Sequence, residues 1–295
     1  MTRRLLCALV IAWLLPWSRA LPGAQRAAAP VGPPRRIVSL IPATTEMLYA
    51  MGAGSRLVGV GSYDRYPPDV EKLPRLGGLL DPNIEQLIAL RPDLVIVYDT
   101  QIELRRQLER ARIPMFSYTM RALPDVATTM RALGERIGLA ANGHAAAIEL
   151  EARLQAVRAS VAGRPRPRTL LVFGRETGSL RGINASGGYG FLHDLVELAG
   201  GADVLADVKQ AAVSMSTEMV IARAPDVIIE LHYGEAWAAS RVDAERRVWL
   251  ALPSVPAVRN NRIVLLTGDE FVVPGPRVIR AAELIAQALH PERGR

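Results

Sequence analysis

The segment IEQLIALRPDLVI, residues 84–96, returns as TEMVIARAPDVII at residues 217–229, at a constant offset of 133 positions. The two copies share a Glu at the second position, an Ala, and a Pro-Asp pair. In each copy, apolar residues at helical spacing stop at the Pro-Asp pair, and a short apolar run follows. The pattern predicts a helix followed by a strand in both halves of the chain.

Two further matches flank this one. Residues Leu48–Val60 can be laid over Val196–Val208 at an offset of 148, and Arg112-Ile113 over Arg262-Ile263 at an offset of 150. Any one match is explained by the sequence features that unrelated strands and helices share, but three matches in the same order indicate two copies of one α/β unit. The first copy then carries 15 additional residues between Val60 and Glu85.

The predicted elements alternate between strands and helices in each copy, which favours parallel sheets covered by helices on both faces. We therefore expect an α/β fold with two Rossmann-like lobes, whose central parallel sheets are joined by a long interdomain helix. The helical, Ala- and Leu-rich stretch between the copies is expected to be interrupted around Gly138, Asn142 and Gly143. The expected limits are a signal peptide at 1–24, a flexible leader at 25–35, lobes at 36–123 and 164–295, and the linking helix at 124–163.

The N-terminus has the three-part layout of a secretory signal peptide. Arg3-Arg4 precede the apolar run Leu5–Trp17, and the small-residue exit Ser18–Ala20 follows. This layout predicts export to the periplasm; an uncleaved anchor helix is the alternative, and the arginine pair is a weak sign of twin-arginine export. Loss of the segment removes three arginines and no acid, which lowers the formal net charge from +7 to +4.

Composition excludes several classes of function. The single cysteine, Cys7, lies within the predicted signal peptide, so an exported chain has no disulfide, thiolate nucleophile or cysteine metal ligand. The arginines are scattered, without a basic stripe or interleaved aromatic residues, which argues against nucleic acid as a partner. None of the four histidines has a second His or Cys at metal-ligand spacing. No nucleophile motif is present, so no catalytic residue is assigned and an enzyme is the minor alternative.

Loops after the strands of an open α/β sheet are where ligands bind. Tyr63 and Tyr66 bracket such a loop and precede Pro67-Pro68, which stiffens it. These tyrosines either pack the loop onto its lobe or offer flat faces to a flat ligand. His232-Tyr233 follow another predicted strand, where the histidine serves either as an axial ligand to a bound metal or as an ordinary hydrogen-bonding residue.

The repeat places Glu85 and Glu218 in the first turn of equivalent helices. An acid there interacts favourably with the helix dipole, which by itself accounts for both residues. The alternative is that each lobe displays one carboxylate, and that the pair engages arginines on the two halves of a symmetric permease.

Over residues 36–289 the chain resembles the helix-linked, class III periplasmic binding proteins, and among them the cobalamin-binding proteins. The most specific stretches are RIVSLIPATTE at 36–46, SYDRYPP at 62–68 and NIEQLIALRPDLVI at 83–96. Weaker support comes from WLALPSVPAV at 249–258 and from Pro276-Arg277. The resemblance implies capture of a ligand between two lobes, without chemistry or a resident cofactor, and delivery by a monomer to an ABC permease dimer with its cytoplasmic ATPase.

The resemblance also implies roles for individual residues. Glu85 and Glu218 match the glutamates that dock on permease arginines, Tyr63 matches a cobalamin-contacting tyrosine, and the segment with Asp269, Glu270 and Phe271 matches a contacting loop. Tryptophans that line the cleft in cobalamin-binding members are replaced here by Leu79, Tyr98 and Ala212. Related members bind haem or ferric siderophores, and Arg175 and Arg181 leave both open. The expected ligand is cobalamin or a related corrinoid, with haem or a ferric siderophore as the alternative.

Overall fold

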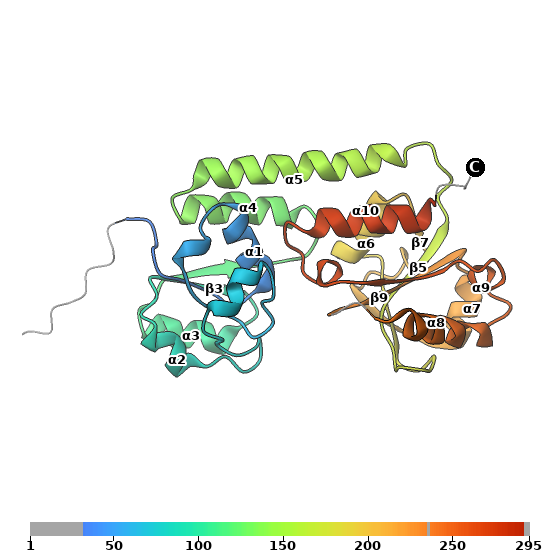
Figure 1. Cartoon of the computed structure of the whole chain (residues 1–295), viewed down its shortest axis with the longest axis horizontal. Helices are drawn as coiled ribbons and strands as arrows, with labels where there is room; N and C mark the ends of the chain where they lie inside the picture. Colours follow the sequence, from blue (N-terminus) through green and yellow to red (C-terminus); the bar gives the residue numbers. More distant parts are fainter. Residues whose placement is uncertain (1–31, 235–236, 292–295) are drawn as a thin grey trace, which may run out of the picture. The chain divides into compact units, whose positions relative to one another are not determined.

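The computed structural model describes residues 32–234 and 237–291 (Figure 1). The predicted signal peptide at 1–24, with its anchor and twin-arginine alternatives, and residues 25–31 of the predicted leader lie outside these described residues. From residue 32 onward the chain forms one compact unit. Along the described chain, no helix is both long and apolar enough to cross a membrane.

The described elements alternate as the repeat predicts. The strands are β1 (Ile37–Ser39), β2 (Leu57–Val60), β3 (Leu94–Tyr98), β4 (Met115–Tyr118), β5 (Arg168–Gly174), β6 (Ile183–Ser186), β7 (Ala202–Asp203), β8 (Ala212–Met215), β9 (Val227–His232) and β10 (Ile263–Thr267). The α-helices are α1 (Pro42–Ala50), α2 (Ile84–Ala89), α3 (Ile102–Arg110), α4 (Asp125–Arg136), α5 (Ala140–Ser160), α6 (Phe191–Leu198), α7 (Thr217–Arg223), α8 (Ala239–Val248), α9 (Pro256–Arg259) and α10 (Val278–Leu289). Short 3-10 turns are η1 (Gly54–Arg56), η2 (Pro68–Lys72), η3 (Trp249–Ala251) and η4 (Asp269–Phe271).

The first lobe is built on a four-stranded sheet in the order β2-β1-β3-β4, in which every pairing is parallel. Its central strands β1 and β3 are buried on both faces, as parallel strands between two layers of helices must be. Leu87 of α2 and Leu104 of α3 cover one face, and α1 covers the other with Met47 and Leu48. Helix α1 begins at Pro42, a residue whose fixed φ suits the first turn.

The second lobe has a six-stranded sheet in the order β10-β9-β5-β6-β8, with β7 paired to β5. The strands β10, β9, β5 and β7 run parallel, whereas β6 is antiparallel to both β5 and β8. The expected parallel sheet is therefore mixed here. The reason lies in the connection between β5 and β6, residues 175–182, which is too short for the crossover that a parallel pair requires.

The repeated segment is also repeated in three dimensions. Helix α2 leads into β3 as α7 leads into β9, and β3 and β9 begin at Leu94 and Val227, which keep the offset of the sequence repeat. Each helix is capped by a side chain, because Asn83 accepts from the Gln86 amide at 3.0 Å and Ser216 from the Met219 amide at 3.3 Å. The upstream match is looser: where β2 forms in the first lobe, the second has only the two-residue strand β7.

Helices α4 and α5 link the lobes. They are separated at Gly138, which has a φ of +73°, a conformation that favours glycine. Gly134 of α4 and Gly143 of α5 let the two backbones approach closely, since a Cβ on Gly134 would lie 2.9 Å from the Gly143 Cα. The helices therefore form a tightly packed antiparallel pair.

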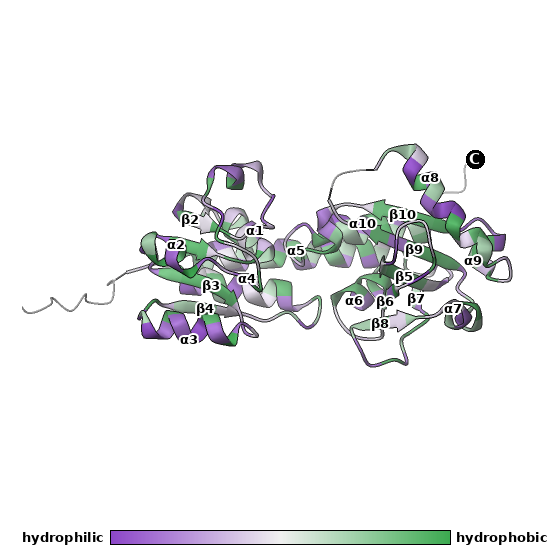
Figure 2. Cartoon of the chain, turned by 90° about the horizontal axis from the view of Figure 1, so that it is seen from below, coloured by the Kyte–Doolittle hydropathy of each residue, from purple (hydrophilic) through white to green (hydrophobic). Residues whose placement is uncertain are grey.

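One hydrophobic core runs beneath α5 through both lobes. It includes Ile96 from the first sheet, Leu154 from α5, Ile229 from the second sheet and Ile285 from α10. Figure 2 shows the hydrophobic strands β5, β9 and β10 and the largely hydrophilic outer helix α3. Because a shared core resists separation, the lobes are held by packing as well as by the linking helices.

The helices on the outer side of each sheet, the outer layer, pack into hydrophobic clusters that are separate from the shared core. Helices α2 and α3 pack with one smaller cluster in the first lobe, and α7 and α9 with another in the second, on the sheet faces opposite to the shared core. Figure 1 shows α2 and α7 on the side away from α5.

Candidate ligand-binding site

A cavity of about 290 Å³ lies between the lobes, and we call it the interlobe hollow. Most of its wall is aromatic or aliphatic. The first lobe contributes Pro42, Ala43, Tyr63, Arg65 and Tyr98, and the second contributes Tyr233, Asp269, Val272, Val273 and Pro274. The predicted strand-end loops of both lobes thus meet at one place, with three tyrosines and a single charge of each sign.

The two outermost tyrosines of the interlobe hollow are unusually exposed. Tyr63 from the first lobe is 70% exposed and Tyr233 from the second is 72% exposed. Exposed aromatic rings facing one cavity leave apolar surface that a ligand can cover.

The loop that carries Tyr63 is held in place by hydrogen bonds from Arg75. Arg75 Nη1 donates to the carbonyl of Gly61 at 3.2 Å and to that of Asp64 at 2.5 Å. Gly78 lets the Tyr63 ring lie close, since a Cβ there would stand 3.2 Å from it. Both Arg75 and Gly78 belong to the additional residues of the first copy, so that insertion supports one wall of the hollow.

Asp64 is buried under this loop and is 1% exposed. Burial raises the pKa of Asp64 to about 7, against the opposing influence of Thr45 and Arg75. Tyr98 lies nearby, and burial together with the Asp64 charge raises the pKa of its phenol above the usual value. Asp64 is therefore neutral over part of the pH range in which an exposed aspartate is charged. Tyr98 likewise stays neutral to a higher pH than an exposed tyrosine does.

Tyr98 forms the floor of the interlobe hollow on the first-lobe side. Its ring lies 5.4 Å from that of Tyr118, and the Tyr118 hydroxyl donates to the Pro274 carbonyl of the second lobe at 3.4 Å. Gln101 accepts from the Tyr98 amide and donates to the Leu79 carbonyl. Leu79 itself lines a different cavity beside α2 and α3.

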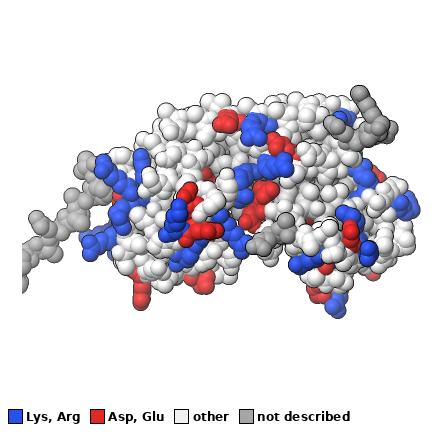
Figure 3. Space-filling view, viewed as in Figure 1, with Lys and Arg blue, Asp and Glu red and all other residues white. Residues whose placement is uncertain are grey.

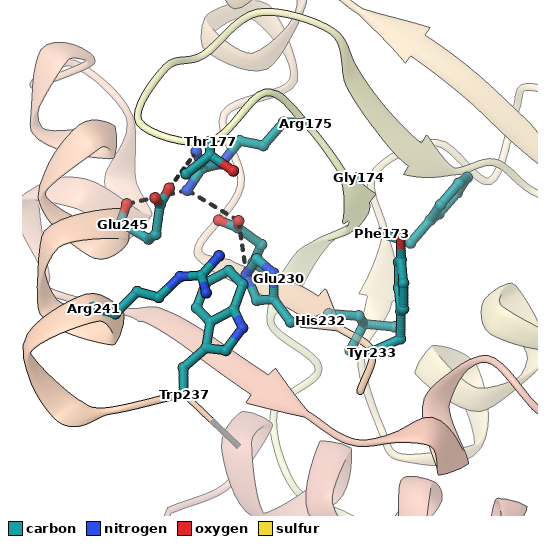
Figure 4. A pocket seen from close by; sticks show the side chains of 11 residues that line it. Phe173, Gly174, Arg175, Thr177, Glu230, His232, Tyr233, Trp237, Arg241 and Glu245 are labelled. Atoms are coloured by element: carbon teal, nitrogen blue, oxygen red, sulfur yellow. Dashed lines mark hydrogen bonds and ion pairs between the residues drawn. The ribbon is translucent and has the colours of Figure 1, made fainter. Parts of the chain in front are cut away.

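The second lobe contains a cavity of about 330 Å³ around His232, the His232 pocket, which shares Tyr233 with the interlobe hollow (Figure 4). His232 Nε2 stands 3.0 Å from Glu230 Oε1, and Arg175 Nη2 stands 3.0 Å from the same oxygen. Arg175 also contacts Glu245 at 2.8 Å. The imidazole is therefore held by a carboxylate that is itself held by a buried guanidinium.

Glu230 is charged in this setting. Burial opposes its ionisation, but His232, Trp249 and Arg175 together hold the pKa of the Glu230 carboxyl below its usual value. Trp237 covers the imidazole, with its ring centroid 3.8 Å from that of His232, and the Arg241 guanidinium lies 3.8 Å from the Trp237 ring centroid. His232 is thus oriented on two sides.

The segment Asp269–Phe271 has one side chain at the interlobe hollow and another in the shared core. Asp269 lines the interlobe hollow and accepts from the Gly234 amide at 3.0 Å, which fixes the backbone after Tyr233. Glu270 points toward Arg277, at 3.7 Å. Phe271 is fully buried in the shared core, so the structure does not bring its side chain to the hollow.

Of the residues predicted to contact ligand, Tyr63, Tyr98, Tyr233 and Asp269 meet in the interlobe hollow, and His232 lies next to it. Five others lie elsewhere: Tyr66 against Arg277, Leu79 beside α2, Glu270 against Arg277, Ala212 on the outer strand β8, and Phe271 in the shared core. Nothing in the sequence indicated that Glu230 or Arg241 would line the site. Arg65, Trp237, Val272, Val273 and Pro274 lie in loops after strands, where the sequence predicts ligand binding, but were not singled out as contact residues.

Glu85 and Glu218 are both exposed, in the first turns of α2 and α7. The Ser216 side chain lowers the pKa of Glu218, which keeps that carboxylate charged. Both helices belong to the outer layer, so the two acids share the side away from α5 (Figure 1). Elsewhere, acidic and basic side chains lie next to one another in the middle of the visible face (Figure 3). Among the described residues, no group of three His, Cys, Asp or Glu side chains is arranged to hold a metal ion.

A comparison with family models decides the class, because the periplasmic binding protein family matches residues 37–270. The chain belongs to the periplasmic binding protein family. The family comprises substrate-binding proteins of ABC transporters, so its members have a ligand and a permease as partners. The resemblance to the helix-linked, cobalamin-binding class is confirmed, as is the two-lobed α/β fold.

Individual relatives agree with this membership. The chain is 29% identical over 256 residues to the vitamin B12-binding protein of Yersinia pestis (strain Pestoides F), covering 86% of each sequence. Among solved structures, the periplasmic vitamin B12 binding protein of Vibrio cholerae is 26% identical with a TM-score of 0.73, over 87% of this chain and 97% of that one. A periplasmic heme-binding protein from Roseiflexus sp. RS-1 is 27% identical with a TM-score of 0.72, over 87% and 98%.

Proposed function

We propose that this family member is periplasmic, exported by residues 1–24, and captures cobalamin or a related corrinoid in the interlobe hollow for an ABC importer. The observation that carries the proposal is the placement of Tyr63 and Tyr233, one from each lobe, exposed on one hollow. Rigid aromatic rings bury the area of a flat ligand at a small entropic cost. The vitamin B12-binding relatives support the choice of ligand.

The charges around the hollow favour a neutral guest. Among the described residues that line it, Arg65 and Asp269 are the charged ones, and their charges balance. A corrinoid carries neutral carboxamide arms at its rim, whereas haem carries two propionates that need cationic partners to offset their desolvation. The balance therefore favours a corrinoid over haem.

Haem or a ferric siderophore is the second candidate, because His232 lies beside the hollow with Arg175 and Arg241 in the same pocket. His232 Nε2 faces Glu230, an arrangement that in metal sites orients the ring and leaves the other nitrogen free. In this reading His232 reaches the guest as an axial ligand or a hydrogen-bonding group. The heme-binding relative supports the alternative.

Delivery follows from the two acids on the outer layer. Residues 36–123 and 164–295 act as the lobes, residues 124–163 link them, and the chain works as a monomer. Glu85 and Glu218 dock on arginines of a permease dimer that is driven by its cytoplasmic ATPase. Binding proceeds without turnover, since the described site offers aromatic and aliphatic surface but no activated nucleophile.

An absorbance titration of the purified protein tests the ligand. Cobalamin, cobinamide, haemin and ferric siderophores are added in turn, and a one-to-one complex with a corrinoid is expected. Tyr63→Ala with Tyr233→Ala is expected to weaken that complex by about 2–4 kcal/mol, since each exposed ring loses its stacking on the guest. Ile148→Ala, an equally exposed apolar truncation on α5, serves as the control. Tight binding of haemin alone would replace the corrinoid by the second candidate.

A further inference from the structure

Arg277 joins the two lobes at the edge of the interlobe hollow. It precedes α10 in the second lobe, and it donates from Nε and Nη2 to Glu46 Oε1 of α1 in the first lobe, at 3.0 and 2.6 Å. The Glu46 side chain is 3% exposed and that of Arg277 is 24% exposed. A charge pair this well covered is poorly screened by solvent, so its two charges attract each other more strongly than those of a surface pair do.

Arg277 also touches the two segments that wall the hollow. Its guanidinium lies 4.4 Å from the ring centroid of Tyr66, at the end of the Tyr63 loop, and 3.7 Å from Glu270, next to Asp269. One side chain is thus in contact with α1 and the Tyr63 loop of the first lobe and with the segment around Asp269 in the second.

The backbone beside Arg277 shows how closely the lobes approach. A Cβ on Gly275 would lie 3.0 Å from Glu46 Oε2 and 3.4 Å from the Ala43 Cα, closer than most Cβ contacts. Ala43 itself lines the interlobe hollow. A side chain at position 275 would therefore press on Glu46 and on the start of α1, where glycine lets the second lobe rest directly.

The electrostatic surroundings make Arg277 indispensable to Glu46. Burial raises the pKa of the Glu46 carboxyl, and the nearby charges of Asp269 and Glu270 raise it further, while Arg277 opposes them. Asp64 adds another acid on the first-lobe side. Without Arg277, the Glu46 carboxylate would keep the unfavourable influence of burial and of these neighbouring acids.

We infer that Arg277 is a positioning residue for the ligand site: through Glu46 and Tyr66 it sets the spacing of the hollow's two walls. This inference rests on the proposed function, since it assigns ligand to the interlobe hollow. Arg277 does not line the hollow, so it acts through the walls that it holds. It governs how long a guest stays clamped between Tyr63 and Tyr233.

The first test measures the lobes without ligand. In the full chain with Cys7→Ser, Glu109→Cys on α3 and Ala222→Cys on α7 place spin labels on exposed positions of different lobes. Arg277→Ala and Gly275→Ala are both expected to broaden and lengthen the distribution of label distances, by loss of the pair and by a wedge respectively. Arg131→Ala breaks a more exposed pair with Glu151, which joins α4 to α5 and does not bridge the lobes at the hollow, and is expected to leave the distances unchanged.

The second test measures dissociation of the chelate that the wild type binds. Arg277→Ala is expected to raise the dissociation rate about 5- to 20-fold with a smaller change in the association rate, and Arg277→Lys to restore part of the loss. Glu46→Gln, which keeps the shape of its partner, checks the result if Arg277→Ala fails to fold. Unchanged label distances in Arg277→Ala and Glu46→Gln would overturn the inference. A wild type that binds none of the chelates would instead refute the proposed function, and the label distances would still decide the role of Arg277.

Discussion

Trp249 Nε1 donates a 2.8 Å hydrogen bond to Glu230 Oε2, and both side chains are fully buried. The other oxygen of Glu230 faces Arg175 and His232. The outer core of the second lobe and the orientation of the His232 ring therefore depend on one carboxylate. Substituting the partners of Glu230 one at a time shows how much each contributes to the stability of the lobe and how much to the properties of the site.

Removing the indole donor of Trp249 tests the contribution of this hydrogen bond to the stability of the lobe. Trp249→Phe leaves Glu230 with one partner fewer in a buried setting, and is expected to lower the free energy of unfolding by about 1–3 kcal/mol. Denaturant unfolding followed by circular dichroism measures the loss. The adjacent Leu250→Ala, at a side chain that is 60% exposed, is the control. Equal stability of Trp249→Phe and wild type would show that the bond contributes nothing net.

Arg175 is expected to matter more than Trp249. Its side chain is 1% exposed and stands between Glu230 and Glu245, so Arg175→Met leaves two buried carboxylates facing each other. Breaking a buried ion pair from one side costs about 3–5 kcal/mol. The exposed Arg181→Met, which loses only a surface pair with Glu176, is the comparison, and a thermal melt of both variants gives the result. Similar melting temperatures would contradict the assigned role of Arg175.

Asp64 predicts a pH dependence of stability. Its folded pKa of about 7 lies above the usual aspartate value of 3.8, so the folded protein binds this proton more tightly than the unfolded chain does. Stability should therefore fall as the pH rises from about 4 to about 7, by up to about 4 kcal/mol from this group. Asp64→Asn, which stays neutral, is expected to flatten that slope and to be more stable than wild type at pH 8. Unfolding curves across this pH range test it, with the exposed Asp69→Asn as control; an unchanged slope in Asp64→Asn would exclude the group.

Local sequence signals were sufficient for much of the fold. Asn83 before α2 and the Pro-Asp pair before β3 are short-range signals that act wherever they occur, which is why β3 begins directly after the Pro-Asp pair, as predicted. Gly138, a predicted helix interruption, separates α4 from α5 for the same kind of reason. The antiparallel strand β6 was missed because strand direction depends on connection length, which the apolar pattern of a strand does not encode.

The candidate site was harder to foresee, because it joins residues that are distant in sequence. Tyr63 and Tyr233 were identified by their place after strands, a rule that needs only local order. The contacts of Trp237 with His232 and of Arg277 with Glu46 could not be predicted, since they depend on how elements pack. Phe271 was expected at the ligand, but the 3-10 turn η4 directs its side chain into the shared core. The turn places Asp269 at the surface and the next aromatic inside.

The two outer-layer acids give a prediction about transport rather than binding. Because Glu85 and Glu218 are exposed and lie outside the interlobe hollow, Glu85→Ala with Glu218→Ala should leave ligand affinity within about twofold of wild type. Uptake of the ligand by cells should fall at least about tenfold, because each lobe loses its charged contact with the permease. Each glutamate changed alone should give an intermediate loss.

The matched control for these acids is Glu103→Ala with Asp243→Ala. Glu103 is an exposed first-turn acid on α3 of the first lobe, and Asp243 is an exposed acid on α8 of the second, so the control removes the same charge from each lobe. Uptake that falls equally in both double variants would trace the effect to net charge and not to docking. Weakened ligand affinity in the Glu85 and Glu218 variant would place those acids at the binding site, against their distance in the fold from the hollow. Normal uptake with normal affinity would leave them as helix-dipole partners of α2 and α7, the other role that their first-turn positions suggest.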